Sequence, residues 1–373
     1  MASGQRTRIL VVDDSAVMRS LLRSVVSAGP GLDVAGTAGD GESALCAIQS
    51  LRPDLVLLDV EMPVMDGLIT LRKLRAKGHK MPVIMCSSLT QRGAKVTIEA
   101  LACGASDYVA KPTGQADRQA ATKALSLELI PKIQALTGMQ RTVQATAPRL
   151  PLIASFAPPP KAQPITSVPV ALAIGVSTGG PAALDILLPE LPGNFPLPVL
   201  IVQHMPELFT KLFAERLNGR CPLRVLEAAE GMPVTVGTIY IAKGNWHMEV
   251  LAASRMGMPN SLHLTQGAPE NHCRPAVDVL FRSVAAVYGA GALALVLTGM
   301  GSDGMLGSRV IRDHGGSVLA QDQASSTVWG MPGAVTNAGL AQKVLPLNAI
   351  APEILRITNR THSEARELRE MVV

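Results

Sequence analysis

Aromatic residues are scarce in this chain of 373 residues, at 3%, and charged residues make up only 17%. The hydrophobic share is nevertheless 47%, with alanine, valine and leucine prominent. A chain with so much apolar surface to bury is not a disordered protein. The composition suits an α/β fold, in which buried parallel strands are runs of small and branched apolar residues. The length is that of two domains rather than one.

A strong positive charge is also lacking where a nucleic-acid-binding domain would need it. The chain has 34 basic and 29 acidic residues. Residues 126–166 carry 4 basic residues and 1 acidic residue, whereas residues 167–373 carry 15 and 16. A domain that binds nucleic acid concentrates positive charge on itself. We therefore expect no nucleic acid among the partners.

Cysteine pairs are absent as well. The five cysteines, none in a C-x-x-C pair or at metal-ligand spacing, are Cys46, Cys86, Cys103, Cys221 and Cys273. Their odd number, and an N-terminus unlike a signal peptide, predict reduced thiols in a cytoplasmic protein.

No hydrophobic run predicts a membrane-spanning helix. The stretch from Ser283 to Ser302 has no charge, but it contains four glycines and its apolar run Ala292–Leu297 has the length of a strand. The end of a helix followed by a buried strand accounts for this pattern. We expect no direct insertion into a membrane.

Residues 1–125 alternate between strand-like and helix-like segments. Helical periodicity, as in Met18–Val26 and Gly41–Ser50, separates the short apolar runs. The alternation predicts a doubly wound parallel sheet of five strands, whose ligands bind beyond the carboxyl ends of the strands. The five runs are Arg8–Val12, Asp33–Gly36, Asp54–Leu58, Pro82–Cys86 and Tyr108–Val109.

The pattern stops after residue 125 and resumes near residue 167. Seven prolines fall between Pro148 and Pro169, which predicts a semi-extended linker over residues 126–166. Beyond it we expect a second doubly wound α/β domain over residues 167–356 and a C-terminal tail over residues 357–373. The buried strands of this second domain are predicted at Val168–Val176, Pro198–Gln203, Thr238–Ala242 and Ala292–Thr298.

Acidic residues stand at two predicted strand ends of the first domain. Asp13 and Asp14 end the first strand, and Asp59 ends the third. Carboxylates gathered at one sheet edge repel one another unless a cation lies among them, and oxygen ligands with a phosphate partner favour Mg²⁺. Lys111, after the fifth strand, could pair its charge with the phosphate, and Ser87, after the fourth strand, could donate its hydroxyl to a phosphate oxygen. The plainer alternatives are a helix cap for the aspartates and a solvated surface lysine.

Together these residues resemble the response-regulator receiver family over residues 7–125, and the stretch LLDVEMPVMDG around Asp59 is a strong motif of that family. The resemblance implies that a histidine kinase supplies the phosphoryl group to Asp59. It implies that the backbone carbonyl of Glu61 joins the aspartates as an Mg²⁺ ligand. It also implies a conformational switch, with the residues Ser87, Tyr108 and Lys111. Serine replaces the threonine common at position 87 and keeps the hydroxyl.

A serine follows the first predicted strand of the second domain. In the run AIGVSTGGPAAL, Ser177 is the centre of a G-x-S-x-G pattern, in which small neighbours allow a sharp turn that exposes the hydroxyl. Backbone N–H groups at a helix start are suited to stabilise an oxyanion. Such clusters are also plain turns or phosphate loops.

A serine nucleophile needs a base and an orienting carboxylate. His204 and Asp303 each follow a predicted buried strand, so both would share a sheet edge with Ser177. We therefore predict a Ser177–His204–Asp303 triad, with the backbone N–H groups of Thr178 and Met300 as oxyanion donors. The chain order of the triad differs from that of α/β-hydrolases.

Other histidines are weaker candidates for the base. His247, His263 and His272 could each be the base, but a lone histidine is more often a structural hydrogen-bonding residue than a catalyst. His272 and Cys273 are adjacent on one segment, where two side chains rarely face each other, so a Cys–His pair is disfavoured. Arg274 is compatible with a substrate carboxylate and with a structural role.

Four segments of the second domain resemble the chemotaxis protein-glutamate methylesterase family over residues 167–352: GVSTGGPAAL, VQHMPELFTKLFAERLN, ENHCRPAVDVLF and LTGMGSDGMLG. The resemblance implies that Ser177 is the nucleophile, His204 the acid/base and Asp303 the orienting carboxylate. It implies demethylation of glutamate methyl esters on the cytoplasmic domains of methylated chemoreceptors, together with deamidation of receptor glutamines. It implies no cofactor at the esterase site, and a receiver that covers the site until it is phosphorylated.

Two other functions remain open at this point. A non-catalytic, phospho-dependent signalling adaptor or transcriptional output is disfavoured by the slight negative charge of the second domain. A nucleotide loop at GVSTGG is disfavoured because no acidic residue follows about 20 positions later.

Overall fold

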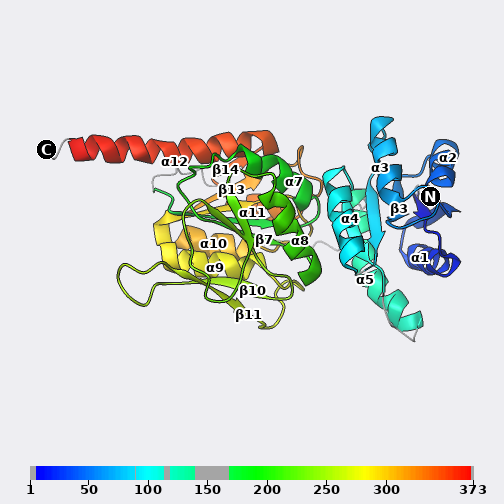
Figure 1. Ribbon diagram of the computed structural model, residues 1–373, viewed down its shortest axis with the longest axis horizontal. Coiled ribbons are helices and arrows are strands. Elements are labelled where there is room, and N and C mark those ends of the chain that lie inside the picture. Colours follow the sequence, from blue (N-terminus) through cyan, green and yellow to red (C-terminus); the bar gives the residue numbers. More distant parts are fainter. Residues whose placement is uncertain (1–5, 89, 113–117, 139–167, 371–373) are drawn as a thin grey trace, which may run out of the picture. The chain divides into compact units, whose positions relative to one another are not determined.

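The computed structural model describes residues 6–88, 90–112, 118–138 and 168–370. These residues form two compact units, one on each side of residues 139–167 (Figure 1). Most of the predicted proline-rich linker lies outside the described residues. No helix among the described residues is long and apolar enough to cross a membrane.

The first unit is a five-stranded parallel sheet in the order β2-β1-β3-β4-β5, as predicted. Strands β3 and β4 are buried along their whole length, which explains their uninterrupted apolar sequences. The strands are β1 (Thr7–Val12), β2 (Leu32–Ala38), β3 (Leu55–Asp59), β4 (Val83–Ser87) and β5 (Asp107–Ala110). The helices are α1 (Ala16–Ala28), α2 (Gly41–Leu51), α3 (Gly67–Ala76), α4 (Gln91–Ala102) and α5 (Arg118–Leu136).

Helices α1 to α4 begin at polar caps. Asp40, Asp66 and Thr90 accept backbone N–H groups at the starts of α2, α3 and α4. At α1 the cap is Ser15, which accepts the N–H of Met18. The cap of α1 is therefore Ser15 and neither of the two aspartates before it, although Asp13 Oδ1 accepts the N–H of Ser15 at 2.9 Å.

The predicted boundary at residue 125 is wrong, because α5 continues to Leu136. Leu129 and Ile133 of this helix are fully buried in the core of the first unit. Pro131 lies inside the helix, where proline removes a backbone hydrogen bond. Burial of the apolar side chains on either side of Pro131 keeps the segment helical, so residues 126–136 belong to the first unit and not to the linker.

The second unit is built on a seven-stranded parallel sheet in the order β14-β13-β12-β6-β7-β9-β8, with an antiparallel hairpin of β10 and β11. The sequence patterns named four of these strands, and the structure adds β8, β13, β14 and the hairpin. The sheet strands are β6 (Ala171–Val176), β7 (Val199–Gln203), β8 (Arg224–Glu227), β9 (Thr238–Ile241), β12 (Ala292–Val296), β13 (Ser317–Gln321) and β14 (Lys343–Leu345). The hairpin strands are β10 (His247–Leu251) and β11 (Ser261–Thr265).

Helices cover this sheet. Helix α9 lies beside α10 in Figure 1, and both contribute to a core cluster with alternate residues of β6, β7 and β12. Helix α12 packs along α7. The helices are α7 (Gly180–Leu187), α8 (Glu207–Asn218), α9 (Val277–Tyr288), α10 (Met305–Asp313), α11 (Met331–Asn337) and α12 (Leu347–Glu370), with short 3₁₀ turns at Leu188–Glu190 and Gly289–Gly291.

The predicted C-terminal tail begins inside α12. The helix passes through residue 356 without a break, and Ile357 and Thr358 are buried. The end of the second unit therefore lies beyond the predicted boundary, because apolar side chains on this helix still face the core.

Close packing of α9 on β6 depends on Gly175. A Cβ atom at this position would lie 2.3 Å from Val277 Cγ1, far inside van der Waals contact. Val277 is a β-branched, fully buried residue at the start of α9, so it has little freedom to move aside. Glycine at 175 is what lets α9 approach the sheet.

Gly175→Ala should destabilise the second unit by about 1–3 kcal/mol, the usual cost of an extra methyl group in a packed core. Both tryptophans, Trp246 and Trp329, lie in this unit, so the midpoint of urea unfolding followed by tryptophan fluorescence reports on it alone. Gly193→Ala is a matched control, because its Cβ would find its nearest neighbour, Pro222 O, at 3.7 Å. Equal midpoints for the two variants would contradict the packing argument.

Candidate active site

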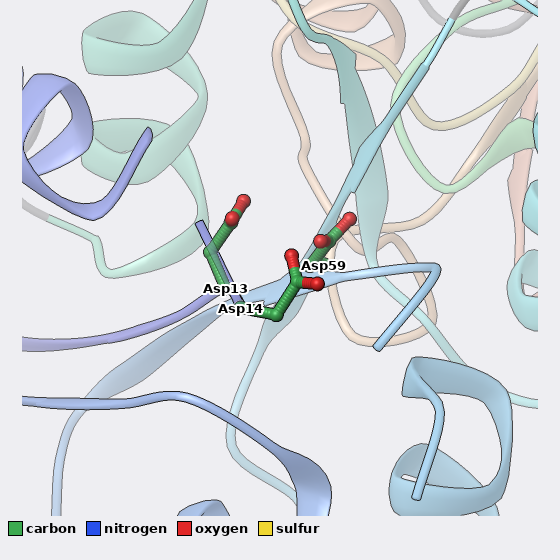
Figure 2. A group of neighbouring side chains, drawn as sticks. All are labelled: Asp13, Asp14 and Asp59. Atoms are coloured by element: carbon green, nitrogen blue, oxygen red, sulfur yellow. The ribbon is translucent and has the colours of Figure 1, made fainter. Parts of the chain in front are cut away.

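Three aspartates meet at one edge of the first sheet. Carboxylate oxygens of Asp13, Asp14 and Asp59 all lie within 4.8 Å of one another (Figure 2). The reason is topological, since β1 pairs with β3 and both strands end at this edge. Asp13 and Asp59 are buried, and Asp14 is exposed. The predicted cluster is confirmed, and its hard oxygen donors at this spacing fit Mg²⁺.

Lys111 is the counter-charge of this cluster. Its Nζ lies 2.7 Å from Asp13 Oδ2 and 2.7 Å from Asp59 Oδ1. Burial acts to lower the pKa of Lys111, but the bonds to the two carboxylates outweigh it and raise the pKa. Burial raises the pKa of Asp59 to about 6, and the bond to Lys111 opposes that rise. A cation beside Asp59 would favour the ionised carboxylate, the form that can act as a nucleophile.

The predicted switch residues lie on the neighbouring strands. Ser87 ends β4, one residue after Cys86, which pairs with Asp59. Its hydroxyl is buried and donates to the carbonyl of Ser88 at 3.2 Å. Tyr108 is buried on β5, and burial raises its pKa well above the usual value. The side chain of Glu61 accepts from Arg92 Nε at 3.3 Å. The metal role of its backbone carbonyl stays a prediction.

In the second unit, Ser177, His204 and Asp303 follow three adjacent strands, β6, β7 and β12. Backbone hydrogen bonds tie the strand ends together: Ser177 N donates to Thr298 O at 3.0 Å, and His204 N donates to Val176 O at 3.2 Å. The structure therefore brings the three predicted residues to one edge of the sheet.

His204 and Asp303 form a hydrogen-bonded pair, with 2.8 Å between Nε2 and Oδ2. Asp303 is buried and also accepts the backbone N–H groups of Val277 (2.7 Å) and Asp278 (3.0 Å) at the start of α9, and the amide of Asn271 (3.0 Å). Burial acts to raise the pKa of Asp303, but the bonds to His204 and to the two backbone N–H groups lower it. Asp303 is therefore an ionised carboxylate that orients the imidazole.

The imidazole of His204 is a strong base. Burial acts to lower its pKa, but hydrogen bonds to Asp303 and Cys273 outweigh burial and raise the pKa to about 9. The second ring nitrogen, Nδ1, lies 3.6 Å from Cys273 Sγ. Cys273 thus faces His204 and not its neighbour His272. This contact was missed from the sequence, since 69 positions separate the two residues.

Gln203 is a second residue that the sequence reasoning missed. Its buried amide Nε2 donates to the carbonyls of Ser177 (3.1 Å) and His204 (3.2 Å). It therefore links the serine turn to the histidine segment. The signal was present in the sequence, as one polar residue at the end of the apolar run LPVLIVQ.

The residues predicted to donate to an oxyanion lie next to the serine. Thr178 follows Ser177, and its carbonyl accepts from Thr298 Oγ1 at 2.9 Å. Met300 follows Gly299, whose backbone is so close that a Cβ there would lie 2.8 Å from Ser177 Cβ. The position is compatible with the predicted role, which stays a prediction.

The other candidate residues have structural partners. His247 is buried between Ala268 O and the N–H of Ala276, and His263 contacts Glu230 near the surface. His272 is exposed. The guanidinium of Arg274 donates to Asn245 Oδ1 and to the backbone carbonyls of Gln266 and Gly267. These bonds favour the structural role over binding of a substrate carboxylate.

Both parts of the chain match families of known proteins. The response regulator receiver domain matches residues 9–123, and CheB methylesterase matches residues 172–354. A protein-glutamate methylesterase/protein-glutamine glutaminase of a Nocardioides species is 50% identical and covers 94% of this chain and 94% of its own. Its counterpart in Trichodesmium erythraeum is 47% identical and covers 94% of this chain and 98% of its own. The crystal structure of the Thermotoga maritima CheB methylesterase catalytic domain is 39% identical, with a TM-score of 0.49, and covers 51% of this chain and 100% of that one.

The two predicted resemblances are thereby confirmed, and this chain belongs to the family of protein-glutamate methylesterases/protein-glutamine glutaminases that carry a receiver domain.

Proposed function

We propose that this protein is a phosphorylation-activated serine hydrolase that removes methyl groups from glutamate methyl esters of chemoreceptors and deamidates receptor glutamines. The observation that carries the proposal is the 2.8 Å pair of His204 and the buried Asp303, at strand ends flanking that of Ser177. The names of the relatives supply the substrate class. A non-catalytic adaptor would not require a partly buried histidine that is oriented by a carboxylate next to a serine turn.

The ester would be cleaved in two steps. Ser177 Oγ attacks the glutamyl carbonyl carbon while its proton passes to His204, and the N–H groups of Thr178 and Met300 stabilise the oxyanion. The C–O bond to the methoxy group breaks, and methanol leaves with the proton from His204. Water, deprotonated by His204, then cleaves the acyl-serine and releases glutamate. With a glutamine substrate, ammonia leaves in place of methanol.

Control would come from the first unit. Asp59 is the carboxylate that receives the phosphoryl group from a histidine kinase. Mg²⁺, held by Asp13, Asp14, Asp59 and the carbonyl of Glu61, would neutralise charge on that group when bound. Lys111 pairs with the phosphoryl oxygens, Ser87 donates its hydroxyl to them, and Tyr108 moves with Ser87. In this proposal the chain consists of a receiver domain up to residue 136, a linker to residue 166 and an esterase domain from residue 167.

Ser177→Ala should abolish methanol release from methylated receptor membranes, because loss of the nucleophile in a triad enzyme lowers turnover on the order of 10⁶-fold. His204→Ala should be comparably severe. A fluorophosphonate probe should label Ser177 in the wild type and leave Ser177→Ala unlabelled.

The matched control is His272→Ala, which removes an exposed histidine from the same part of the unit. Activity of Ser177→Ala within tenfold of wild type would exclude the serine mechanism. If His272→Ala lost as much activity as His204→Ala, at unchanged stability, the choice of His204 as the base would be wrong.

Asp59→Asn should remove stimulation by a small phosphodonor such as acetyl phosphate and keep the low basal esterase activity. Asp59 belongs to the acidic cluster of the first unit, and its side chain has no role in the hydrolytic chemistry. Methanol release with and without phosphodonor measures both quantities. Stimulation that survives in Asp59→Asn would place the phosphoacceptor elsewhere.

Deletion of residues 1–165 should raise activity above that of the unphosphorylated full-length protein, if the receiver acts by covering the site. The isolated domain should then be faster on receptor membranes and on a small ester alike. A receiver that serves only to dock the enzyme predicts slower hydrolysis of receptors and no change on the small ester. An isolated domain no faster on either substrate would rule out autoinhibition.

A further inference from the structure

Both ring nitrogens of His204 have partners within the second unit. Nε2 lies 2.8 Å from Asp303 Oδ2, and Nδ1 lies 3.6 Å from Cys273 Sγ. An ionised carboxylate can only accept hydrogen bonds, so Nε2 carries a proton in both charge states of the ring. The proton that leaves Ser177 must therefore be accepted at Nδ1, the nitrogen that faces Cys273.

On the basis of the hydrolase function proposed above, we propose that Cys273 is a positioning residue of the esterase: its sulfur holds His204 Nδ1 in the substrate-free enzyme and must yield that nitrogen to Ser177 before the ester is attacked. The sulfur touches neither ester nor oxyanion in this scheme. It acts only through the histidine.

The turn that carries Cys273 is firmly built. Glu270 and Cys273 exchange two backbone hydrogen bonds, of 3.1 and 2.8 Å, and the two residues between them have left-handed φ angles of 50° and 62°. The first of these residues, Asn271, donates its side-chain amide to Asp303 and to Asp278, both at 3.0 Å. The turn is thus anchored to the same carboxylate that orients His204, so the position of the thiol is fixed relative to the ring.

The contact favours the charged form of the ring. The thiol can donate to Nδ1 of the neutral imidazole, and the sulfur accepts from Nδ1–H of the imidazolium. The second bond is the stronger because its donor is charged, so the contact stabilises the imidazolium more than the neutral ring. The titratable groups facing His204 are Asp303, from the segment after β12, and Cys273, from the turn before α9; Asp278 of α9 lies behind Asp303, joined to it through Asn271. Burial acts to lower the pKa of His204, and Asp303 and Cys273 together raise it to about 9.

The sign of the effect on catalysis follows. A histidine must be neutral to accept the serine proton, so a raised pKa leaves less base available below that pKa. Hydrolysis should increase as the pH rises toward the pKa of His204. Removing the sulfur should lower that pKa and increase the share of neutral His204 near pH 7. Cys273 therefore restrains the substrate-free enzyme at neutral pH.

The experiment uses full-length Cys273→Ala and Cys273→Val. Neither side chain can hydrogen-bond, and valine keeps most of the volume. We would measure kcat/KM for methanol release, and the rate of fluorophosphonate labelling of Ser177, as functions of pH. In both variants the rising limb of each profile should move to lower pH by about half a unit or more. At a pH below the limb, this shift corresponds to about a threefold higher rate than in the wild type. Cys221→Ala, a partly exposed thiol of the same unit, should leave the limb in place.

A limb that stays in place in both variants, or a uniform loss of activity at every pH, would overturn the proposal and leave Cys273 as packing only. Loss of fluorophosphonate labelling in Cys273→Ala together with labelling of Cys273 in the wild type would overturn it too, because the thiol would then be the nucleophile.

An NMR titration of the His204 ring does not depend on hydrolysis. It should show a lower pKa in both Cys273 variants than in the wild type. If the wild type neither releases methanol nor reacts with the probe, the proposed function fails, while this titration still decides whether Cys273 holds the ring. An unchanged titration in an enzyme that does hydrolyse the ester defeats the inference alone.

Discussion

The buried carboxylate of Asp303 is the group on which the hydrolytic site depends. Removing a carboxylate from water is costly unless its oxygens are hydrogen-bonded. Here they accept from Val277 and Asp278 at the start of α9, from Asn271 and from His204. The start of a helix also carries a partial positive charge, which favours the ionised form. Because the backbone groups of α9 move only with the helix, the packing of α9 on the sheet sets the direction of Asp303 and, through it, of the His204 ring.

The sites of the two units form by the same topological rule but differ in the charges that they bring together. In each, residues that are distant in sequence meet because neighbouring parallel strands end at one edge. The receiver edge gathers like charges, and only Lys111 among the residues described there offsets Asp13 and Asp59. Such an edge is compatible with a bound cation. At the esterase edge the carboxylate of Asp303 already accepts hydrogen bonds from His204, Asn271 and the start of α9, so no cation is needed there to offset it.

The sequence was sufficient for residues that stand directly at strand ends. Asp59, Ser177 and His204 each follow an uninterrupted apolar run, and such runs are typical of buried parallel strands. Strands β8 and β14 were missed because they are short and partly exposed, so their sequences show no apolar run.

Contacts made by turns could not be predicted. Cys273 lies against His204 only because the turn from Glu270 to Cys273 folds back through two left-handed residues. Nothing in the spacing of Asn271 or Cys273 indicates this, since the deciding hydrogen bonds run to Asp303. The first domain was ended too early, at residue 125, because the sequence does not show that Leu129 and Ile133 of α5 are buried in its core.

The charges of the receiver edge limit how its signal can travel. A phosphoryl group on Asp59 adds negative charge beside Lys111, which is already shared between Asp13 and Asp59 at 2.7 Å each. Lys111 would then redistribute its bonds. Ser87, at the end of β4, and Lys111, after β5, stand on the strands that follow β3 in the sheet. Strand β2, at the other edge of the sheet, has no part in the cluster. A ligand shifts an equilibrium only by its difference in affinity for the two states. We therefore expect the surface that reports phosphorylation to lie on the side of β4 and β5, where Ser87 and Lys111 stand.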